Sequence, residues 1–207
     1  VTGVQTCALP ISLLYLREEI LGLSQYGIVY LLVIGMLGVV VVTGHRIKLV
    51  EIGSIIFVTV YIFVGFYSLY MLRDLSLAHI GYLLLTIWFT DSFAYIGGMR
   101  FGKNKLSPKI SPNKSIEGSV IGSLSSIVIA LVFYFTTSIF TNLAVAIGIT
   151  LVVSVIGQFG DLIESAYKRE YGVKDSSNLL PGHGGIFDRF DSVILSAPCL
   201  ILLLNLL

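Results

Sequence analysis

The chain has 207 residues, of which 56% are hydrophobic and 12% are charged, and its formal net charge is +1. A soluble domain carries about twice that share of charged residues, and a mean hydropathy of +0.93 is typical of a chain that contacts lipid. The composition therefore excludes an ordinary soluble domain, and the small net charge gives no reason to expect nucleic-acid binding. Cys7 and Cys199 lie far apart and form no metal or redox motif.

The first 25 residues form a segment that we leave outside the fold prediction. The stretch VTGVQTCALPIS begins with Val, has no clear helical period and lacks the charged region of a signal peptide. It resembles the translation of sequencing-adaptor read-through. We therefore treat residues 1–25 as a segment of uncertain origin.

Six apolar runs follow, and most approach the roughly 20 residues that a helix needs to cross the hydrocarbon core of a bilayer. They predict an all-α, polytopic integral membrane protein with about six transmembrane helices. Helices 1–3 are expected within residues 26–98, helices 4 and 5 within 118–160, and helix 6 in the short run 193–207. The runs are Tyr26–Thr43, Leu49–Tyr70, Ser76–Gly98, Gly118–Phe140, Asn142–Gly160 and Val193–Leu207.

The positions of Lys and Arg predict how these helices are oriented. When six helices are threaded in order, residues 44–48, 99–117 and 161–192 fall on one side and hold 11 of the 13 basic residues. The positive-inside rule assigns such a side to the cytoplasm. We therefore expect a multi-pass protein of the inner (plasma) membrane, with a cytosolic basic loop at 99–117 and a cytosolic polar segment at 161–192.

The first polar segment, residues 91–118, contains a partial match to a phosphate-binding P-loop. Gly97, Gly102 and Lys103 have the required spacing, but Asn104 stands where the motif needs a metal-holding Ser or Thr. The element before it is also predicted to be a membrane helix instead of a buried strand, so we reject a P-loop. A basic loop remains, and its alternatives are contact with anionic lipid headgroups or the binding of phosphates.

Two further features of this segment suggest function. The spacing allows Ser111 to cap a helix that starts at Pro112, which would place Lys114 beside free backbone N–H groups. Asp91 lies inside an apolar run, where an ionisable side chain is costly and is therefore a candidate functional residue. The alternative for Asp91 is a headgroup-level side chain that only hydrates the end of its helix.

One helix face in the second polar segment carries four polar side chains. Their spacing of i, i+3, i+4 and i+7 places them in one row at the membrane surface, and two further Asp residues repeat the i, i+3 spacing where the next helix begins. Carboxylate oxygens of this kind suit Mg²⁺, whereas ordinary solvated helix ends are the alternative. The row is Asp161, Glu164, Ser165 and Lys168, and the two further residues are Asp188 and Asp191.

The stretch Pro181–Gly185 between these two groups predicts a turn. Its glycines permit positive φ angles and allow backbone N–H groups to point at an anion. His183 is a candidate acid–base group or phosphate donor, and the alternative is a histidine that only stabilises the turn. The turn also gives the chain a place to fold back, which would bring Asp161 and Asp188 together around a cation.

Both segments resemble the phosphatidate cytidylyltransferase family, also called CDP-diacylglycerol synthases. The stretch SAYKREYGVKDSSNLLPGHGGIFDRFDS is similar to the family signature of Ser, Lys-Arg, Lys-Asp, Pro-Gly-His-Gly-Gly and Asp-Arg-x-Asp. The stretch from Asp91 through Lys114 to Glu117 is similar to a second conserved block, with Ser115 where many members have Thr. Family members are longer, so the resemblance implies that one or more helices precede this chain.

The resemblance implies a reaction in which CTP and phosphatidic acid give CDP-diacylglycerol and pyrophosphate for phospholipid biosynthesis, with Mg²⁺ required. A second cation and a homodimer are left open, and no nucleic acid is expected as a partner. The catalytic candidates are Asp161, Lys168, His183, Asp188 and Arg189. The substrate-binding candidates are Ser165, Arg169, Lys174, Gly184, Gly185, Lys103, Lys114 and Asp91. The metal candidates are Asp161 and Asp188, with Glu164, Asp175 and Asp191 as secondary ligands.

There are three alternatives to this prediction. The CDP-alcohol phosphotransferases are membrane enzymes with clustered Asp, but their D-G-x-x-A-R motif is absent from this sequence. A transporter or ion pathway built around Asp91 would distribute polar residues through several helices, whereas here they are expected at the cytosolic ends. The third alternative is a folded but inactive truncated synthase.

Overall fold

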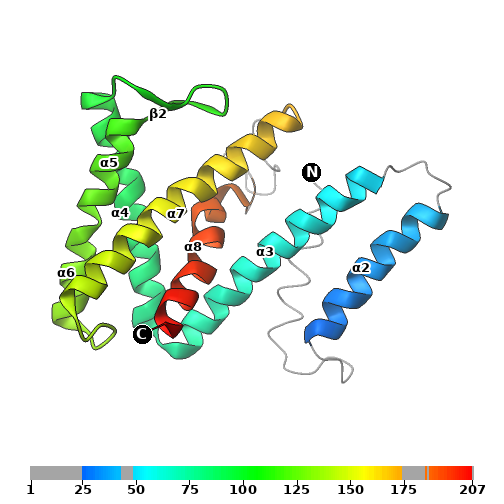
Figure 1. Cartoon of the computed structure of the whole chain (residues 1–207), viewed down its shortest axis with the longest axis horizontal. Coiled ribbons are helices and arrows are strands. Elements are labelled where there is room, and N and C mark those ends of the chain that lie inside the picture. Colours follow the sequence, from blue (N-terminus) through cyan, green and yellow to red (C-terminus); the bar gives the residue numbers. More distant parts are fainter. Residues whose placement is uncertain (1–24, 43–48, 174–184, 186, 207) are drawn as a thin grey trace. The chain divides into compact units, whose positions relative to one another are not determined.

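The computed structural model is helical apart from one β-hairpin in the residues that it describes, which are 25–42, 49–173, 185 and 187–206 (Figure 1). The N-terminal segment 1–24 therefore lies outside the described residues. Two compact units make up the chain, Val1–Tyr67 and Ser68–Leu207. The polar segments of interest both belong to the second unit.

The first unit contains α2 (Gln25–Val42) and most of α3 (Leu49–Leu75), which correspond to the first two predicted apolar runs. Some apolar side chains of this part of α3 are buried, among them Ile52 and Ile62. Others are exposed, and the side chain of Phe57 is 61% exposed. Exposed aromatic and aliphatic side chains are expected on a helix that contacts lipid acyl chains.

Four helices among the described residues are long and apolar enough to cross a bilayer. This number and the helical content give the chain the architecture of an integral membrane protein. The helix α8 (Phe187–Asn205), which contains most of the sixth predicted run, has three charged residues among its first five and is not among the four. The four segments are Ile52–Leu75, Leu77–Phe101, Ile116–Thr136 and Leu143–Glu170.

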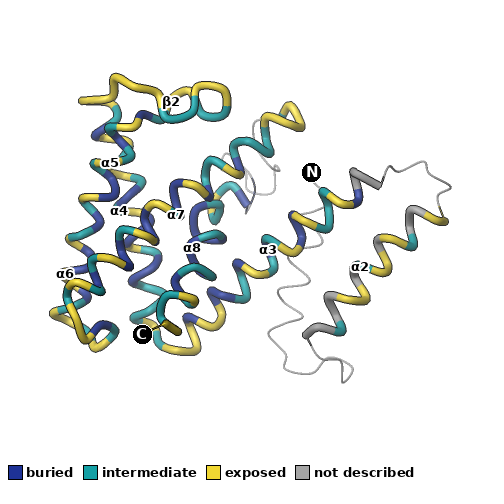
Figure 2. Tube along the Cα trace, viewed as in Figure 1, coloured by how far each residue is buried: buried dark blue, intermediate teal, exposed yellow. Residues whose placement is uncertain are grey.

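The second unit is built on two helix pairs, in which α4 (Leu77–Phe101) packs along α5 (Ile116–Ser125) and α7 (Leu143–Glu170) packs along α8. The helix α6 (Ile127–Thr136) follows α5 directly and packs on α7. Burial is concentrated on the faces that the helices turn toward one another (Figure 2). The fully buried side chains there include Tyr82, Leu83, Val153, Ile194 and Leu200.

Glycines allow α4 and α5 to approach closely. A Cβ atom at Gly118 would lie 2.5 Å from the carbonyl oxygen of Ala94, and one at Gly122 would lie 2.6 Å from the carbonyl oxygen of Thr90. Backbone atoms cannot move aside as the tip of a long side chain can. Small residues at such crossings are typical of membrane helices, where packing replaces the hydrophobic effect between helices.

The basic loop between α4 and α5 contains an antiparallel hairpin of β1 (Lys105–Ser107) and β2 (Ser111–Ser115). The prediction that Ser111 caps a helix starting at Pro112 is therefore wrong. Pairing with β1 keeps the backbone extended through Ser115, and it is the hydroxyl of Ser115 that accepts the N–H of Gly118 at 3.2 Å. The helix consequently starts four residues later than expected.

The rejection of a P-loop agrees with the structure. Gly97 is buried inside α4, which continues to Phe101, so a helix precedes Lys103 where a P-loop needs a strand. The backbone N–H groups of Lys103 and Asn104 donate to the carboxylate of Glu117 at 3.1 and 3.2 Å. These contacts attach the base of the hairpin to the first turn of α5.

Candidate active site at the end of helix α7

The last three turns of α7 carry the row of polar side chains that their spacing predicts. Ser165 Oγ donates to Asp161 Oδ1 at 3.3 Å, one turn apart on the helix. Lys168 Nζ lies 2.5 Å from Glu164 Oε2, again one turn apart. All four side chains therefore face the same side of α7, as expected for residues three and four apart.

Lys168 joins α7 to the beginning of α8. Its ammonium group contacts Glu164 and also lies 3.1 Å from Asp188 Oδ1. The Glu164 side chain is 1% exposed and the Asp188 side chain is 8% exposed. One ammonium group thus neutralises part of the charge of two carboxylates that are almost removed from water, where an unpaired charge is very costly.

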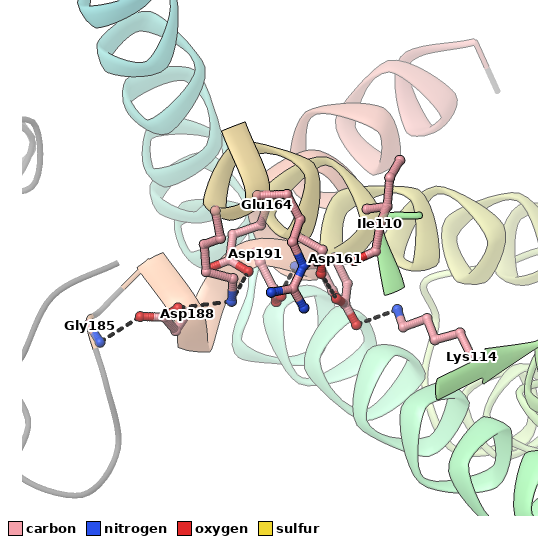
Figure 3. A network of polar contacts seen from close by, with 11 residues as sticks. Ile110, Lys114, Asp161, Glu164, Gly185, Asp188 and Asp191 are labelled. Carbon is pink, nitrogen blue, oxygen red and sulfur yellow. Dashed lines mark hydrogen bonds and ion pairs between the residues drawn. The ribbon is translucent and has the colours of Figure 1, made fainter. Parts of the chain in front are cut away.

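Two further atoms complete this arrangement. The backbone N–H of Gly185 donates to Asp188 Oδ2 at 2.6 Å (Figure 3). The anion that this N–H binds is therefore a carboxylate of the same chain. Glu164 Oε1 is buried and has no hydrogen-bond partner within the described part of the chain. A buried carboxylate oxygen without a donor is rare in native proteins and marks a place where a cation or a proton is expected.

A second ion pair connects the hairpin to α7. Lys114, at the end of β2, forms an ion pair with Asp161 Oδ2, and Figure 3 shows the two side chains pointing at each other. The charges of Lys114 and Asp161 also act on Asp91 in α4. Residues from three elements, α4, β2 and α7, therefore meet at this point.

Asp191, which lies outside the four candidate membrane spans, belongs to the same group. Burial first, and then the charges of Asp161 and Asp91, raise the pKa of Asp191 to about 7. Burial disfavours the charged form of the carboxyl group, and the neighbouring carboxylates add to this effect by repulsion. Asp91, Asp161 and Asp191 are therefore close enough to repel one another, with Lys114 as the cation that acts on them.

Gly160 explains why the start of α8 comes so close to α7. A Cβ atom at Gly160 would lie 2.6 Å from the carbonyl oxygen of Asp191 and 3.0 Å from the Cα atom of Ser192. The backbone of α8 thus rests directly on the glycine, one residue before Asp161. The chain folds back so that α8 packs along α7, whereas residues 181–184 of the predicted turn lie outside the described residues. The charge of Asp161 acts on Asp191, and Asp188 contacts Lys168.

A third link involves the hairpin turn. Arg169 Nε donates to the carbonyl oxygen of Ile110 at 3.3 Å. Together with the Lys114 ion pair, this contact brings the two polar segments of the sequence into one site. Lys103 and Arg189 are both exposed, and Lys103 contacts Glu117 through its backbone only. The predicted residues Lys174, Asp175, His183 and Gly184 lie outside the described residues.

The acidic side chains of this site are candidate ligands for a divalent cation. No three His, Cys, Asp or Glu side chains within the described ranges are already gathered in a metal-binding group. Five carboxyl groups belong to this part of the molecule. The two lysines form ion pairs with three of them, Asp161, Glu164 and Asp188, and one oxygen of Glu164 has no partner in the described part of the chain. Hard oxygen donors with a surplus of negative charge have the chemistry that Mg²⁺ requires. The five are Asp91, Asp161, Glu164, Asp188 and Asp191.

The sequence analysis did not identify Gln158, a buried polar residue that precedes the charged groups on α7. Gln158 is 6% exposed and hydrogen-bonded to α5, one turn before Asp161. A glutamine inside an apolar run was a readable signal, because a polar side chain within a membrane helix needs a partner. The partner itself, on α5, was not readable.

Comparisons with known proteins identify the family. The chain belongs to the cytidylyltransferase family, whose model matches residues 2–207. Similar curated proteins are phosphatidate cytidylyltransferases of Staphylococcus aureus (strain COL) and Staphylococcus haemolyticus, each 41% identical over 169 residues, and of Staphylococcus epidermidis, 42% identical over 169 residues. Each alignment covers 82% of this chain and 65% of the relative. The chain therefore spans just under two thirds of these relatives.

Proposed function

We propose that this chain is the catalytic part of a phosphatidate cytidylyltransferase, which converts CTP and phosphatidic acid into CDP-diacylglycerol and pyrophosphate. Family membership and the names of the relatives support the reaction. The observation that carries the proposal is the convergence of signature residues at the end of α7, where Lys168 contacts both Glu164 and Asp188. Residues 24 positions apart in the sequence meet there within hydrogen-bonding distance of one ammonium group.

The charges of the site suit this chemistry. A phosphatidate oxygen forms a bond to the α-phosphorus of CTP, while the bond from that phosphorus to the bridging oxygen of the leaving pyrophosphate breaks. Both reactants are anions that repel each other, so positive side chains must surround the reacting phosphorus. Lys168 is held in place by two carboxylates, and Arg169, Arg189 and Lys114 lie on the elements that meet around it. Lys174 and Lys103 are the further predicted substrate contacts.

The proposal includes Mg²⁺, which when bound would neutralise charge on the triphosphate and on the leaving pyrophosphate. The first ligand candidates remain Asp161 and Asp188, with Glu164, Asp175 and Asp191 as secondary candidates. The orphaned, buried oxygen of Glu164 supports a cation in this region. A second cation is compatible with the number of carboxylates.

The proposed location is the cytoplasmic face of the plasma membrane, at the level of the lipid headgroups. One substrate is a lipid and the other is soluble, so the site must be reached from both phases. Most of the charged cluster lies on the last three turns of α7 and beside the beginnings of α5 and α8, which agrees with that level. The proposed topology has six transmembrane helices.

Cysteine labelling tests this topology. In a background with Cys7 and Cys199 replaced by Ala, Asn104→Cys and Ser177→Cys should react with a membrane-impermeant thiol reagent only from the cytoplasmic side. One residue lies in each polar segment, so labelling of either from outside would contradict a shared cytosolic site.

The activity is tested with membranes that contain this chain, with CTP and phosphatidic acid supplied. We expect pyrophosphate release that depends on CTP, on phosphatidic acid and on Mg²⁺, and that disappears on chelation. The Asp188→Asn chain at equal membrane abundance is the matched control. Release that continues without phosphatidic acid, or an inactive parent chain, would contradict the proposal for this chain.

A transporter built around Asp91 is not favoured. The expectation that polar residues cluster at the helix ends is wrong for uncharged side chains, because hydroxyl groups of α4, α5 and α7 form interhelical hydrogen bonds within the bundle. They are neutral and bonded to one another, as in a packing contact. The charges of Lys114 and Asp161, which form an ion pair between β2 and α7, act on Asp91.

A further inference from the structure

A chain of hydrogen-bonded, uncharged side chains, here called the seam, lies inside the second unit next to the charged residues. It consists of Thr90, Ser154, Ser123 and Gln158. Thr90 Oγ1 donates to Ser154 Oγ at 2.9 Å, and Ser154 Oγ donates to Ser123 Oγ at 3.1 Å. Gln158 Nε2 donates to the same Ser123 hydroxyl at 2.9 Å. These four side chains come from α4, α5 and α7 and are at most 9% exposed. The seam therefore connects three helices through buried hydrogen bonds.

Gln158 is the member of the seam that lies nearest to the proposed active site. Besides Ser123, its amide nitrogen donates to the backbone carbonyl of Ser119 at 3.3 Å. Both acceptors belong to α5 and lie one turn apart, so the side chain spans one turn of the neighbouring helix. Asp161 follows Gln158 by three residues and therefore lies on the same side of α7.

The ion pair of Lys114 and Asp161 is the next link between the same two chain segments. Lys114 precedes α5 by two residues, and Ser115 caps that helix through Gly118. Lys114 contacts Asp161, and the later residues Ser119 and Ser123 contact Gln158, which precedes Asp161. The two segments are therefore antiparallel. The amide hydrogen bonds and the ion pair are thus consecutive contacts between α7 and the segment formed by the end of β2 and α5, which runs in the opposite direction to α7.

The register between these helices decides whether the ion pair can form. A slide of one residue moves an α-helix by 1.5 Å and its side chains by about 100°. Such a slide would remove Lys114 from Asp161 and leave Asp91, Asp161 and Asp191 to repel one another. In hydrocarbon no water replaces a lost interhelical partner, so Gln158 can specify the register although each bond contributes little to stability.

We propose that Gln158 is a positioning residue, which sets the register of α7 on α5 and thereby holds Asp161 against Lys114. It acts through Asp161 and does not touch the substrates. The inference concerns the geometry of the site, and its consequence for turnover rests on the proposed function.

The test is a set of double-mutant cycles on the intact chain in detergent, measured as the thermal unfolding midpoint. Lys114→Met, Asp161→Asn and the double variant are compared in three backgrounds: the parent, Gln158→Met and Thr150→Val. Thr150 is the matched control, because it also lies on α7 and its hydroxyl shares a buried interhelical hydrogen bond with Tyr82 at 2.6 Å. Unlike Gln158, Thr150 lies three turns away from Asp161.

We expect the effects of the two single variants to be non-additive by roughly 2–4 °C in the parent, as for a coupled pair of residues. The non-additivity should fall by at least half with Gln158→Met and remain with Thr150→Val. An undiminished value with Gln158→Met overturns the proposal, and so does an equal loss in both backgrounds, which indicates general loosening. If Gln158→Met does not accumulate in membranes, Ser123→Ala removes one of its two acceptors and should reduce the non-additivity in the same direction.

Turnover is measured in parallel with the pyrophosphate assay. We expect Gln158→Met to lower kcat about 10-fold, since misplaced catalytic groups cost rate even far from the chemistry, and Thr150→Val to retain the parent rate. A parent chain without activity but with the expected loss of non-additivity would refute the proposed function and leave the positioning role intact. Full activity of Gln158→Met with unchanged non-additivity would refute the positioning role alone.

Discussion

Helix α7 is held by neutral hydrogen bonds along its middle and by ion pairs along its last turns. Thr150 and Ser154 bond to hydroxyl groups of Tyr82 and Thr90 on α4. Asp161, seven residues after Ser154, forms an ion pair with Lys114, and Lys168 forms one with Asp188. The same helix therefore changes from one kind of contact to the other within about two turns.

The difference follows from the surroundings. Inside the apolar bundle a hydroxyl pair satisfies its own hydrogen-bonding needs at small cost, whereas a charge would lose its hydration. At the end of the bundle, charges can be partly hydrated and can meet ionic substrates. We infer that substitutions along the middle of α7 change stability, whereas substitutions along its last turns change turnover.

The largest expected effect comes from Asp188→Asn. The variant keeps an acceptor for the Gly185 N–H but removes the charge that holds Lys168 at 3.1 Å. We expect turnover to fall by at least about 100-fold, the usual loss for a group that stabilises transition-state charge. The protein should remain in the membrane at normal abundance. Near-normal activity with an unchanged Mg²⁺ requirement would exclude Asp188 as a ligand and as the support of Lys168.

Gly160→Ala should have the next largest effect. The new methyl group meets backbone atoms of Asp191 and Ser192, which cannot move without shifting α8. We expect a loss of roughly 1–3 kcal/mol in the free energy of unfolding, as for an overpacked contact, and a fall in turnover. Gly148→Ala is the control on the same helix, because a Cβ there meets nothing within 4 Å. Equal losses of stability and turnover in the two variants would show that the close contact at Gly160 is no more important than the open surroundings of Gly148.

The pH dependence of stability should report Asp191. Its folded pKa of about 7 lies above the ordinary value of 3.8, so between these values the folded protein binds more protons than the unfolded chain. The free energy of unfolding should therefore fall as the pH rises from about 4 to 7 and level off above that. Thermal unfolding in the presence of a chelator measures this slope, and Asp191→Asn should flatten it. If the free energy of unfolding of Asp191→Asn still falls between about pH 4 and 7, another group is responsible for the pH dependence.

The smallest expected effect is that of Thr150→Val. Losing one interhelical hydrogen bond in a membrane bundle costs about 0.6 kcal/mol on average. We expect a slightly lower unfolding midpoint and an unchanged rate of pyrophosphate release. A large loss of activity would show that neutral contacts of α7 far from Asp161 also affect turnover.

Much of the site was readable from spacing alone. The row of Asp161, Glu164, Ser165 and Lys168 lies on one helix face because an α-helix repeats every 3.6 residues, and this geometry is local. The apolar runs and the position of the charged segments follow from composition in the same way. The beginning of α8 beside Asp188 was also expected from the change from polar to apolar residues.

The pairing of the charges was decided only by the tertiary structure. Spacing suggested that Asp161 and Asp188 meet, but Gly160 brings α8 against α7 in a register that places Asp191 near Asp161 and Asp188 near Lys168. The hairpin likewise moved the helix cap from Ser111 to Ser115. Local periodicity determines which face of a helix a side chain occupies, whereas its partner depends on how neighbouring helices slide and rotate, which is set by close contacts between residues far apart in the chain.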